Sequence, residues 1–218
     1  MVAKIGLITI GQSPRSDMTP EMKPLLGSAV SFMEVGALDD LSEKEIEHLA
    51  PSANEVTYIS RLRSGKSVKL SKAKLLPYLQ DQLNKVEEQV ASSIVVCTGS
   101  FPTLTYKKPL LFPDQILKSV VQAVIGDGTL GLIVPLEEQK NQLMEKWGNV
   151  PVVAAAVSPY EEADFEAPAK ELKKKGATIF VLDCMGYTEA HKEKVKSATG
   201  LPTILSRSIV ARIAAEMA

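Results

Sequence analysis

The aliphatic stretch KIGLITI at residues 4–10 decides the fold class, because its pattern returns in the second half of the chain. Ile5-Gly6-Leu7-Ile8 is matched by Leu130-Gly131-Leu132-Ile133. Val95-Val96-Cys97-Thr98-Gly99 is matched in the same way by Leu182-Asp183-Cys184-Met185-Gly186. These short apolar runs are typical of strands that are buried on both faces of a parallel sheet. The echo predicts two halves built on one plan.

Segments with helical periodicity separate the apolar runs. Expected strands cover residues 4–10, 29–35, 94–97, 130–134, 151–157 and 178–183, and a hairpin is expected from 56–60 and 68–70. Expected helices follow Ser42, Ser71 and Pro113, cover 137–147 and 163–175, run from Thr188 to Gly200, and begin again at Ser206 or Ser208. In the helix after Ser71, the predicted core seam is Leu76, Leu79, Leu83, Val86 and Val90.

Strands that alternate with helices indicate an α/β protein with parallel sheets covered on both faces. A single eight-stranded sheet or barrel is one arrangement. Two pseudo-symmetric lobes, each with a parallel sheet of about four strands flanked by helices, fit the internal echo better. The predicted boundaries are residues 1–111 for the first lobe, completed by 204–218, and 112–203 for the second.

Composition excludes several classes of protein. The chain has 218 residues, of which 45% are hydrophobic and 23% charged, and its formal net charge is −1, so a dedicated nucleic-acid binder is not expected. Two cysteines and two histidines provide neither a disulfide framework nor a usual zinc pattern, and no metal is predicted. No signal peptide and no membrane helix of about eighteen apolar residues is expected, which predicts a cytoplasmic protein with no membrane partner.

The two cysteines are the strongest candidates for catalysis. Cys97 and Cys184 each end an apolar strand and have a glycine two residues later. Ligands of open parallel sheets bind beyond the carboxyl ends of the strands, where backbone N–H groups and a helix N-terminus are expected to lower a thiol's pKa. Two thiols facing one cleft would suit two-base stereoinversion. The alternative is that both cysteines fill the core, as buried thiols often do.

The loop after the first strand is a candidate binding site. Gln12, Ser13 and Arg15 offer an amide, a hydroxyl and a guanidinium that could grip a carboxylate or phosphate. The alternative is that Arg15 pairs with Asp17 or with another acidic residue on the surface. The loop is neither a Walker loop nor a dinucleotide fingerprint. Arg61, Arg63 and Lys66 lie on the hairpin, where they could cap an acidic ligand, although an exposed ribbon is the favoured interpretation.

Other candidate substrate-binding residues lie beside the thiols or at another strand end. Ser158 and Tyr160 follow the strand 151–157, where a plain turn is the alternative. Asp183 could tune the neighbouring thiol, although a carboxylate beside a thiol raises its pKa. The full candidate set beside the thiols is Thr98, Gly99, Ser100, Met185, Gly186, Tyr187 and Thr188.

Several of these motifs, in this order, resemble the AroM protein family over nearly the whole chain. The motifs are residues 10–15 (IGQSPR), 33–39 (MEVGALD), 97–102 (CTGSFP), 158–160 (SPY) and 182–188 (LDCMGYT). More distantly, the paired cysteines resemble the aspartate/glutamate racemase superfamily, which includes hydantoin racemases, maleate isomerases and arylmalonate decarboxylases. That resemblance implies a two-lobed α/β fold, no cofactor, and a small carboxylate-like substrate in the interlobe cleft.

The distant resemblance also implies roles for individual residues. Cys97 and Cys184 match the two catalytic thiols, and Thr98 and Thr188 match substrate-binding hydroxyls. Glutamate racemases have Thr and His directly after the second cysteine, whereas this chain has Met185 and Gly186. Their early Asp-Ser loop is replaced here by residues 12–15, QSPR, so glutamate and aspartate are not the expected substrates.

Three functions follow from these observations. The first is a cofactor-independent racemase or isomerase that acts beside a carboxylate or carbonyl. The second is a non-catalytic protein that binds a small carboxylate or another anion, and the third is a decarboxylase or lyase that uses one thiol. The expected partner is a small carboxylate-like or anionic ligand, and a homodimer is left open.

Overall fold

The computed structural model describes residues 3–28 and 30–218. The chain forms two compact units: Met1–Pro113 with Arg212–Ala218, and Asp114–Ala211. The sequence predicted that the second lobe ends before residue 204, whereas the second unit continues to residue 211. A short strand, β10 (Thr203–Leu205), pairs with the sheet of the second unit, which places residues 204 and 205 in that unit.

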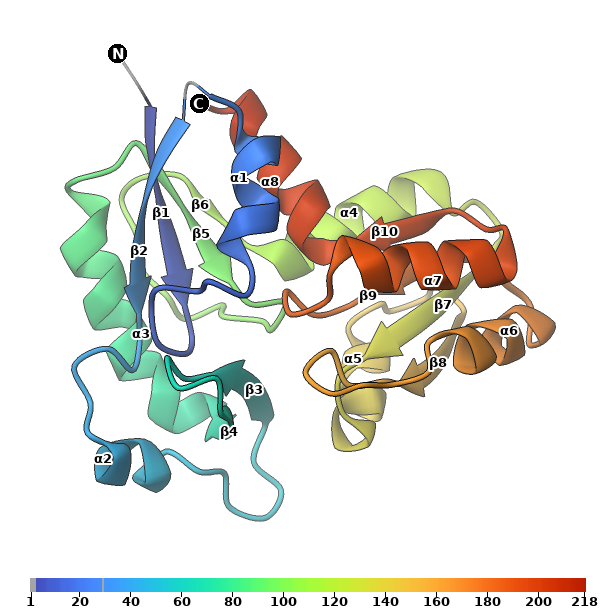
Figure 1. The fold of residues 1–218 in the computed structure, drawn as a ribbon, viewed down its shortest axis with the longest axis horizontal. Coiled ribbons are helices and arrows are strands. Elements are labelled where there is room, and N and C mark those ends of the chain that lie inside the picture. The colour runs from blue at the N-terminus through green and yellow to red at the C-terminus, as the bar shows by residue number, and fades with distance from the viewer. Residues whose placement is uncertain (1–2, 29) are drawn as a thin grey trace. The chain divides into compact units, whose positions relative to one another are not determined.

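The first unit contains a four-stranded parallel sheet in the order β2-β1-β5-β6 (Figure 1). Its strands are β1 (Ala3–Thr9), β2 (Val30–Gly36), β5 (Ser92–Val96) and β6 (Leu110–Leu111). The predicted start of the second strand, Ala29, lies outside the described residues. The expected hairpin is present as the antiparallel pair β3 (Thr57–Arg61) and β4 (Ser67–Ser71).

The second unit contains another four-stranded parallel sheet, in the order β10-β9-β7-β8. The strands preceding β10 in the chain are β7 (Thr129–Val134), β8 (Val152–Ala156) and β9 (Ala177–Leu182). If the strands of each sheet are numbered along the chain, both sheets have the order 2-1-3-4. The sequence echo therefore matches equivalent strands: β1 with β7, and β5 with β9.

Helices connect the strands. They are α1 (Thr19–Leu26), α2 (Glu43–His48), α3 (Lys72–Glu87), α4 (Pro113–Val124), α5 (Lys140–Glu145), α6 (Glu166–Lys174), α7 (Glu189–Thr199) and α8 (Ser206–Glu216). The expected helix 137–147 is instead a 3₁₀ turn, Glu137–Gln139, followed by the short α5. The expected helix 163–175 begins later, at Glu166. No helix in the described part of the chain is long and apolar enough to cross a bilayer.

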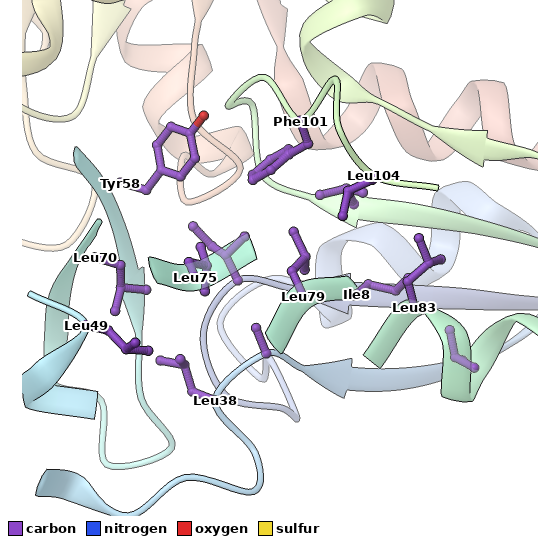
Figure 2. Close-up of a cluster of buried hydrophobic side chains, with 14 of the residues drawn as sticks. Ile8, Leu38, Leu49, Tyr58, Leu70, Leu75, Leu79, Leu83, Phe101 and Leu104 are labelled. Atoms are coloured by element: carbon purple, nitrogen blue, oxygen red, sulfur yellow. The ribbon is translucent and has the colours of Figure 1, made fainter. Parts of the chain in front are cut away.

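One core of the first unit lies between its sheet, α3 and the β3–β4 hairpin. Figure 2 shows Leu75, Leu79 and Leu83 of α3 packed with Ile8 of β1 and with Leu70 of the hairpin. Leu75 takes the inward position that the predicted seam gave to Leu76, which is half-buried. The hairpin is therefore part of the core of this unit.

The second sheet has a hydrophobic cluster on each face. Phe165 and Leu172 pack with Phe180 in one cluster, and Leu117 and Trp147 belong to the other. Each side chain named here is at most 2% exposed. Burial on both faces explains why β7 is apolar from Leu130 to Val134 and β9 from Ile179 to Leu182.

Candidate active site

Both cysteines lie at equivalent places in the two sheets. In each sheet, the first strand pairs with the second strand on one side and with the third on the other. Ligands of open α/β sheets bind beyond the carboxyl ends of the strands, at the point where the strand order reverses. Cys97 directly follows the third strand of its sheet, and Cys184 follows the third strand of its sheet after one residue.

The two thiols have the same backbone contact. The Gly99 N–H donates to the Cys97 Sγ over 3.3 Å, and the Gly186 N–H donates to the Cys184 Sγ over 3.4 Å. Both cysteines are partly exposed and neither forms a disulfide. An N–H directed at sulfur stabilises a thiolate more than a neutral thiol. Each Cys-x-Gly turn therefore presents a reachable sulfur in a setting that favours its reactive form.

A tyrosine ring lies against each of these glycines. A Cβ at Gly99 would come within 2.5 Å of Tyr58 Cζ, and a Cβ at Gly186 within 2.7 Å of the Tyr160 hydroxyl. Tyr58 also donates from its hydroxyl to the Ser100 carbonyl over 3.1 Å. In the core view, Tyr58 lies near Phe101, and their ring centroids are 5.3 Å apart (Figure 2). The sequence predicts Tyr160 as a site residue but does not single out Tyr58.

The loop 11–15 is held inside the first unit by Asp39. The Asp39 carboxylate accepts hydrogen bonds from Ser13 N at 2.7 Å, Ser13 Oγ at 2.6 Å and Gly36 N at 2.7 Å. Arg63 pairs with the same carboxylate at 2.7 Å and donates to the Ser13 carbonyl. Gln12 donates to Leu38 O over 3.3 Å and accepts from Arg63 N over 3.0 Å. The hairpin is therefore docked on this loop. Arg63 is exposed, as expected for a residue of an exposed ribbon, and it also contacts Asp39 and Ser13.

Arg15 is buried and engages Asp17 in a two-point contact. Its Nε and one terminal nitrogen donate to the two Asp17 oxygens at 2.8 and 2.7 Å, and the other terminal nitrogen donates to Thr9 and Ser60. Burial alone would raise the pKa of Asp17, but the hydrogen bonds and charge of Arg15, with the charge of Arg61, hold that pKa below its usual value. The Arg15 guanidinium, predicted to bind a ligand, is therefore engaged by Asp17. The loop that carries Arg15 begins beside the strand that leads to Cys97, because Thr9 pairs with Val96.

Tyr187 and Thr188 have structural contacts after Cys184. The Tyr187 hydroxyl is buried and donates to Val157 O over 2.7 Å, and burial with the nearby Cys184, Asp183 and Tyr160 raises its pKa well above its usual value. The Thr188 hydroxyl accepts from His191 N over 3.3 Å and caps α7. The His191 ring is partly buried and stacks on Phe165, with ring centroids 4.4 Å apart.

Charged side chains surround the Cys184 turn. Asp183 has a fully buried side chain and pairs with Lys146 at 2.5 Å. Arg207 is also buried and donates from Nε to the Met185 carbonyl over 3.0 Å. Burial, with the charge of Asp183 as a smaller cause, raises the pKa of Asp114, whereas the charge of Lys146 opposes that rise. The sequence singles out Asp183 among these residues and misses Lys146, Arg207 and Asp114.

The structure thus gathers the candidate residues into two groups. In the first unit, Cys97, buried Thr98 and Gly99 and exposed Ser100 follow β5, next to the end of β1 from which the loop 11–15 begins. In the second unit, Tyr160 lies against the Cys184 turn, and Ser158 accepts from Tyr160 N over 3.2 Å. Among the described residues, no group of three or more His, Cys, Asp or Glu side chains could hold a metal ion.

The fold is shared with several solved enzymes. A glutamate racemase from Bacillus anthracis aligns over 99% of this chain and 81% of its own, with 14% identity and a TM-score of 0.62. A maleate isomerase from Pseudomonas putida S16 aligns over 97% and 90%, with 12% identity and a TM-score of 0.56. An arylmalonate decarboxylase aligns over 98% and 91%, with 13% identity and a TM-score of 0.58.

These likenesses define the class of fold. The chain has the α/β fold of aspartate/glutamate racemase-like proteins, with two parallel four-stranded sheets flanked by helices. The family model described as AroM protein matches residues 5–218, so the chain belongs to the AroM family. No curated protein matches it by sequence.

Proposed function

We propose that this protein is a cofactor-independent racemase or isomerase that acts on a small carboxylate through Cys97 and Cys184. The observation that carries the proposal is the repeated thiol contact, a glycine N–H donated to each sulfur at 3.3 and 3.4 Å, on equivalent strands of two sheets with one strand order. A core-filling role requires neither a partly exposed sulfur nor the same contact twice.

The proposed chemistry is a proton exchange between two sulfurs and one carbon. One cysteine, as thiolate, takes the proton from the carbon beside the carboxylate, and the electron pair of that C–H bond delocalises into an enediolate. The other cysteine, as thiol, gives its proton to the opposite face of the same carbon. The first cysteine ends as thiol and the second as thiolate, so no proton or electron is consumed and the roles reverse for the return reaction.

The carboxylate class of substrate is supported by the similar structures and by the turns themselves. Three of the similar proteins are named for glutamate, maleate and arylmalonate, which are carboxylates, whereas a fourth is named for allantoin, which is not. Arg15 is engaged with Asp17, so we assign it to shaping the loop, and we assign anion contacts to backbone N–H groups of the two Cys-x-Gly turns. Met185 and Gly186 follow the second thiol, which argues against glutamate and aspartate as substrates.

Hydrogen exchange in deuterated water tests the proposal. Purified protein is incubated with a panel of small chiral 2-amino, 2-hydroxy and 2-aryl carboxylates, and NMR and optical rotation follow exchange and inversion. We expect deuterium at the carbon beside the carboxylate of the substrate. Because a hydroxyl is a far weaker base than a thiolate, Cys97→Ser and Cys184→Ser should each lower inversion by about 10²-fold or more.

The same experiment separates the other two functions. Binding of a carboxylate without exchange, unchanged in both serine variants, would identify a non-catalytic binding protein. Loss of carbon dioxide that depends strongly on one cysteine would identify a decarboxylase. The decarboxylase has support of its own, because Cys97 follows the apolar Val96 whereas Cys184 follows the buried carboxylate of Asp183.

A further inference from the structure

The two thiol turns differ in the charge of the residue that precedes the cysteine. Val96 precedes Cys97, whereas Asp183, with a side chain that is 0% exposed, precedes Cys184. We propose that Lys146 is a positioning residue that keeps Cys184 reactive by neutralising Asp183. This inference rests on the proposed function, in which Cys184 transfers a proton as thiolate and thiol.

The geometry places Lys146 against Asp183. Its Nζ lies 2.5 Å from Asp183 Oδ2, and its own side chain is 18% exposed. Lys146 is the C-cap residue of α5, and its ammonium also lies 5.4 Å from the ring centroid of buried Trp147. On the other side, Asp183 N donates to Ile133 O over 2.9 Å, which continues the β7–β9 ladder. Both partners are therefore anchored to elements with a buried core.

The pairing changes the electrostatic setting of Cys184. A carboxylate in the residue next to a thiol opposes ionisation of that thiol, and a buried carboxylate is poorly screened by water. A cation in direct contact with the carboxylate cancels most of this field. Without Lys146, the negative charge beside Cys184 would be less compensated, whereas Cys97 has no such neighbour in the preceding residue.

Other titratable groups in the second unit face the same turn. Tyr160 and Tyr187 interact with each other and lie near Cys184, and the ring of His191 lies 6.0 Å from that of Tyr187. Arg207 binds the Met185 carbonyl, and Asp114 interacts with both Lys146 and Asp183. Lys146 forms an ion pair with the Asp183 carboxylate, so it is the residue to change.

The test measures the reactivity of Cys184 directly, without a substrate. In a Cys97→Ser background, the rate of alkylation by iodoacetamide is measured from pH 5 to pH 10, since only the thiolate displaces iodide. We expect Lys146→Met to raise the apparent pKa of Cys184 by about one unit, which slows alkylation near neutral pH by up to about tenfold. Lys146→Arg keeps the charge and should retain the parent profile.

Two further variants protect the test against a loss of folding. Asp183→Asn removes the carboxylate and should leave Cys184 at least as reactive as in the parent. Lys146→Met combined with Asp183→Asn should restore the parent profile, which a purely structural role for Lys146 would not do. In a Cys184→Ser background, Lys146→Met should leave alkylation of Cys97 unchanged.

Two results would overturn the inference. One is an unchanged Cys184 profile in folded Lys146→Met, and the other is a double variant as slow as the single one. Because alkylation needs no turnover, these results are independent of the deuterium experiment. Failure of exchange with a normal Lys146 effect would remove the proposed reaction and leave the electrostatic role of Lys146 in place.

Discussion

Positions 99 and 186 require glycine because a tyrosine side chain lies close to each, and not because of an unusual backbone angle. Neither has a positive φ, but a Cβ at either position would meet a tyrosine at less than 3 Å. The two rings differ in freedom, because Tyr58 is 4% exposed and packs on Phe101, whereas Tyr160 is half-buried. The first turn is therefore the more tightly packed of the two.

Replacing each of these glycines with alanine should destabilise the protein to a different extent in the two turns. We expect Gly99→Ala to lower the free energy of unfolding by about 1–3 kcal/mol, because the buried Tyr58 ring must shift. Gly186→Ala should cost less, because the Tyr160 ring can move toward solvent. Denaturant unfolding measures both, with Ser100→Ala as a control on an exposed neighbour. Equal costs for the two alanines would contradict this account.

The Arg15–Asp17 pair predicts a dependence of stability on pH. Because the folded pKa of Asp17 is below its unfolded value, its stabilisation is present in full above about pH 5 and is lost as pH falls through the folded pKa. The difference in unfolding free energy between the parent protein and Asp17→Asn should therefore shrink between pH 5 and pH 2. A difference that stays constant over this range would exclude such a linkage.

A site residue could be predicted from the sequence when the features that identify it lie within one short segment. Cys97 and Cys184 are found because the strand end, the thiol and the glycine two residues later lie within one short segment. Tyr58 and Lys146 are missed because each meets its turn only after the chain folds, across about 40 residues. The occupation of Arg15 by Asp17 was one of two alternatives, and only burial and distance decide between them.

Elements with local start and stop signals were predicted closely. The helix expected after Ser42 is present and begins with a capping box between Ser42 and Glu45, and α7 runs from the Thr188 cap to Gly200 in the left-handed conformation. By contrast, α1 contains two prolines and lacks a side-chain cap, and β6 has two residues. These elements were not predicted, because the formation of α1 depends on tertiary contacts and that of β6 on pairing with a strand distant in sequence.

The cap of α7 provides a prediction at this scale. The Thr188 hydroxyl, expected to bind substrate, accepts from His191 N. Thr188→Ala should therefore lower the free energy of unfolding by about 1 kcal/mol, whereas Thr188→Ser keeps the acceptor and should lose much less. Thermal unfolding compares the pair, with Ser42→Ala as a matched cap of α2. An alanine variant as stable as the parent would remove the capping role.

At the scale of the whole molecule, the repeated 2-1-3-4 sheet explains why the echo in the sequence could predict the fold. The matched segments are the first and third strands of each unit, which lie side by side in their sheets. The second unit reaches its third strand sooner, because the first inserts α2 and the hairpin β3–β4 before β5. The repeat thus accounts for the position of each thiol within its own sheet. The proposed reaction further requires that both thiols reach one carbon.

Two-base transfer through one carbon requires each sulfur to come within roughly 3–4 Å of that carbon, so the sulfurs should lie roughly 7–10 Å apart when a moderately open site is allowed for. A bifunctional maleimide spanning about 8 Å should therefore join Cys97 to Cys184 within one chain. Mass spectrometry of the intact and digested protein should find one bridging reagent per chain and no remaining thiol. Cys97→Ser and Cys184→Ser each supply a control that accepts one reagent at one end. Two separate adducts on every parent chain, with no bridge at low protein concentration, would rule out a shared carbon.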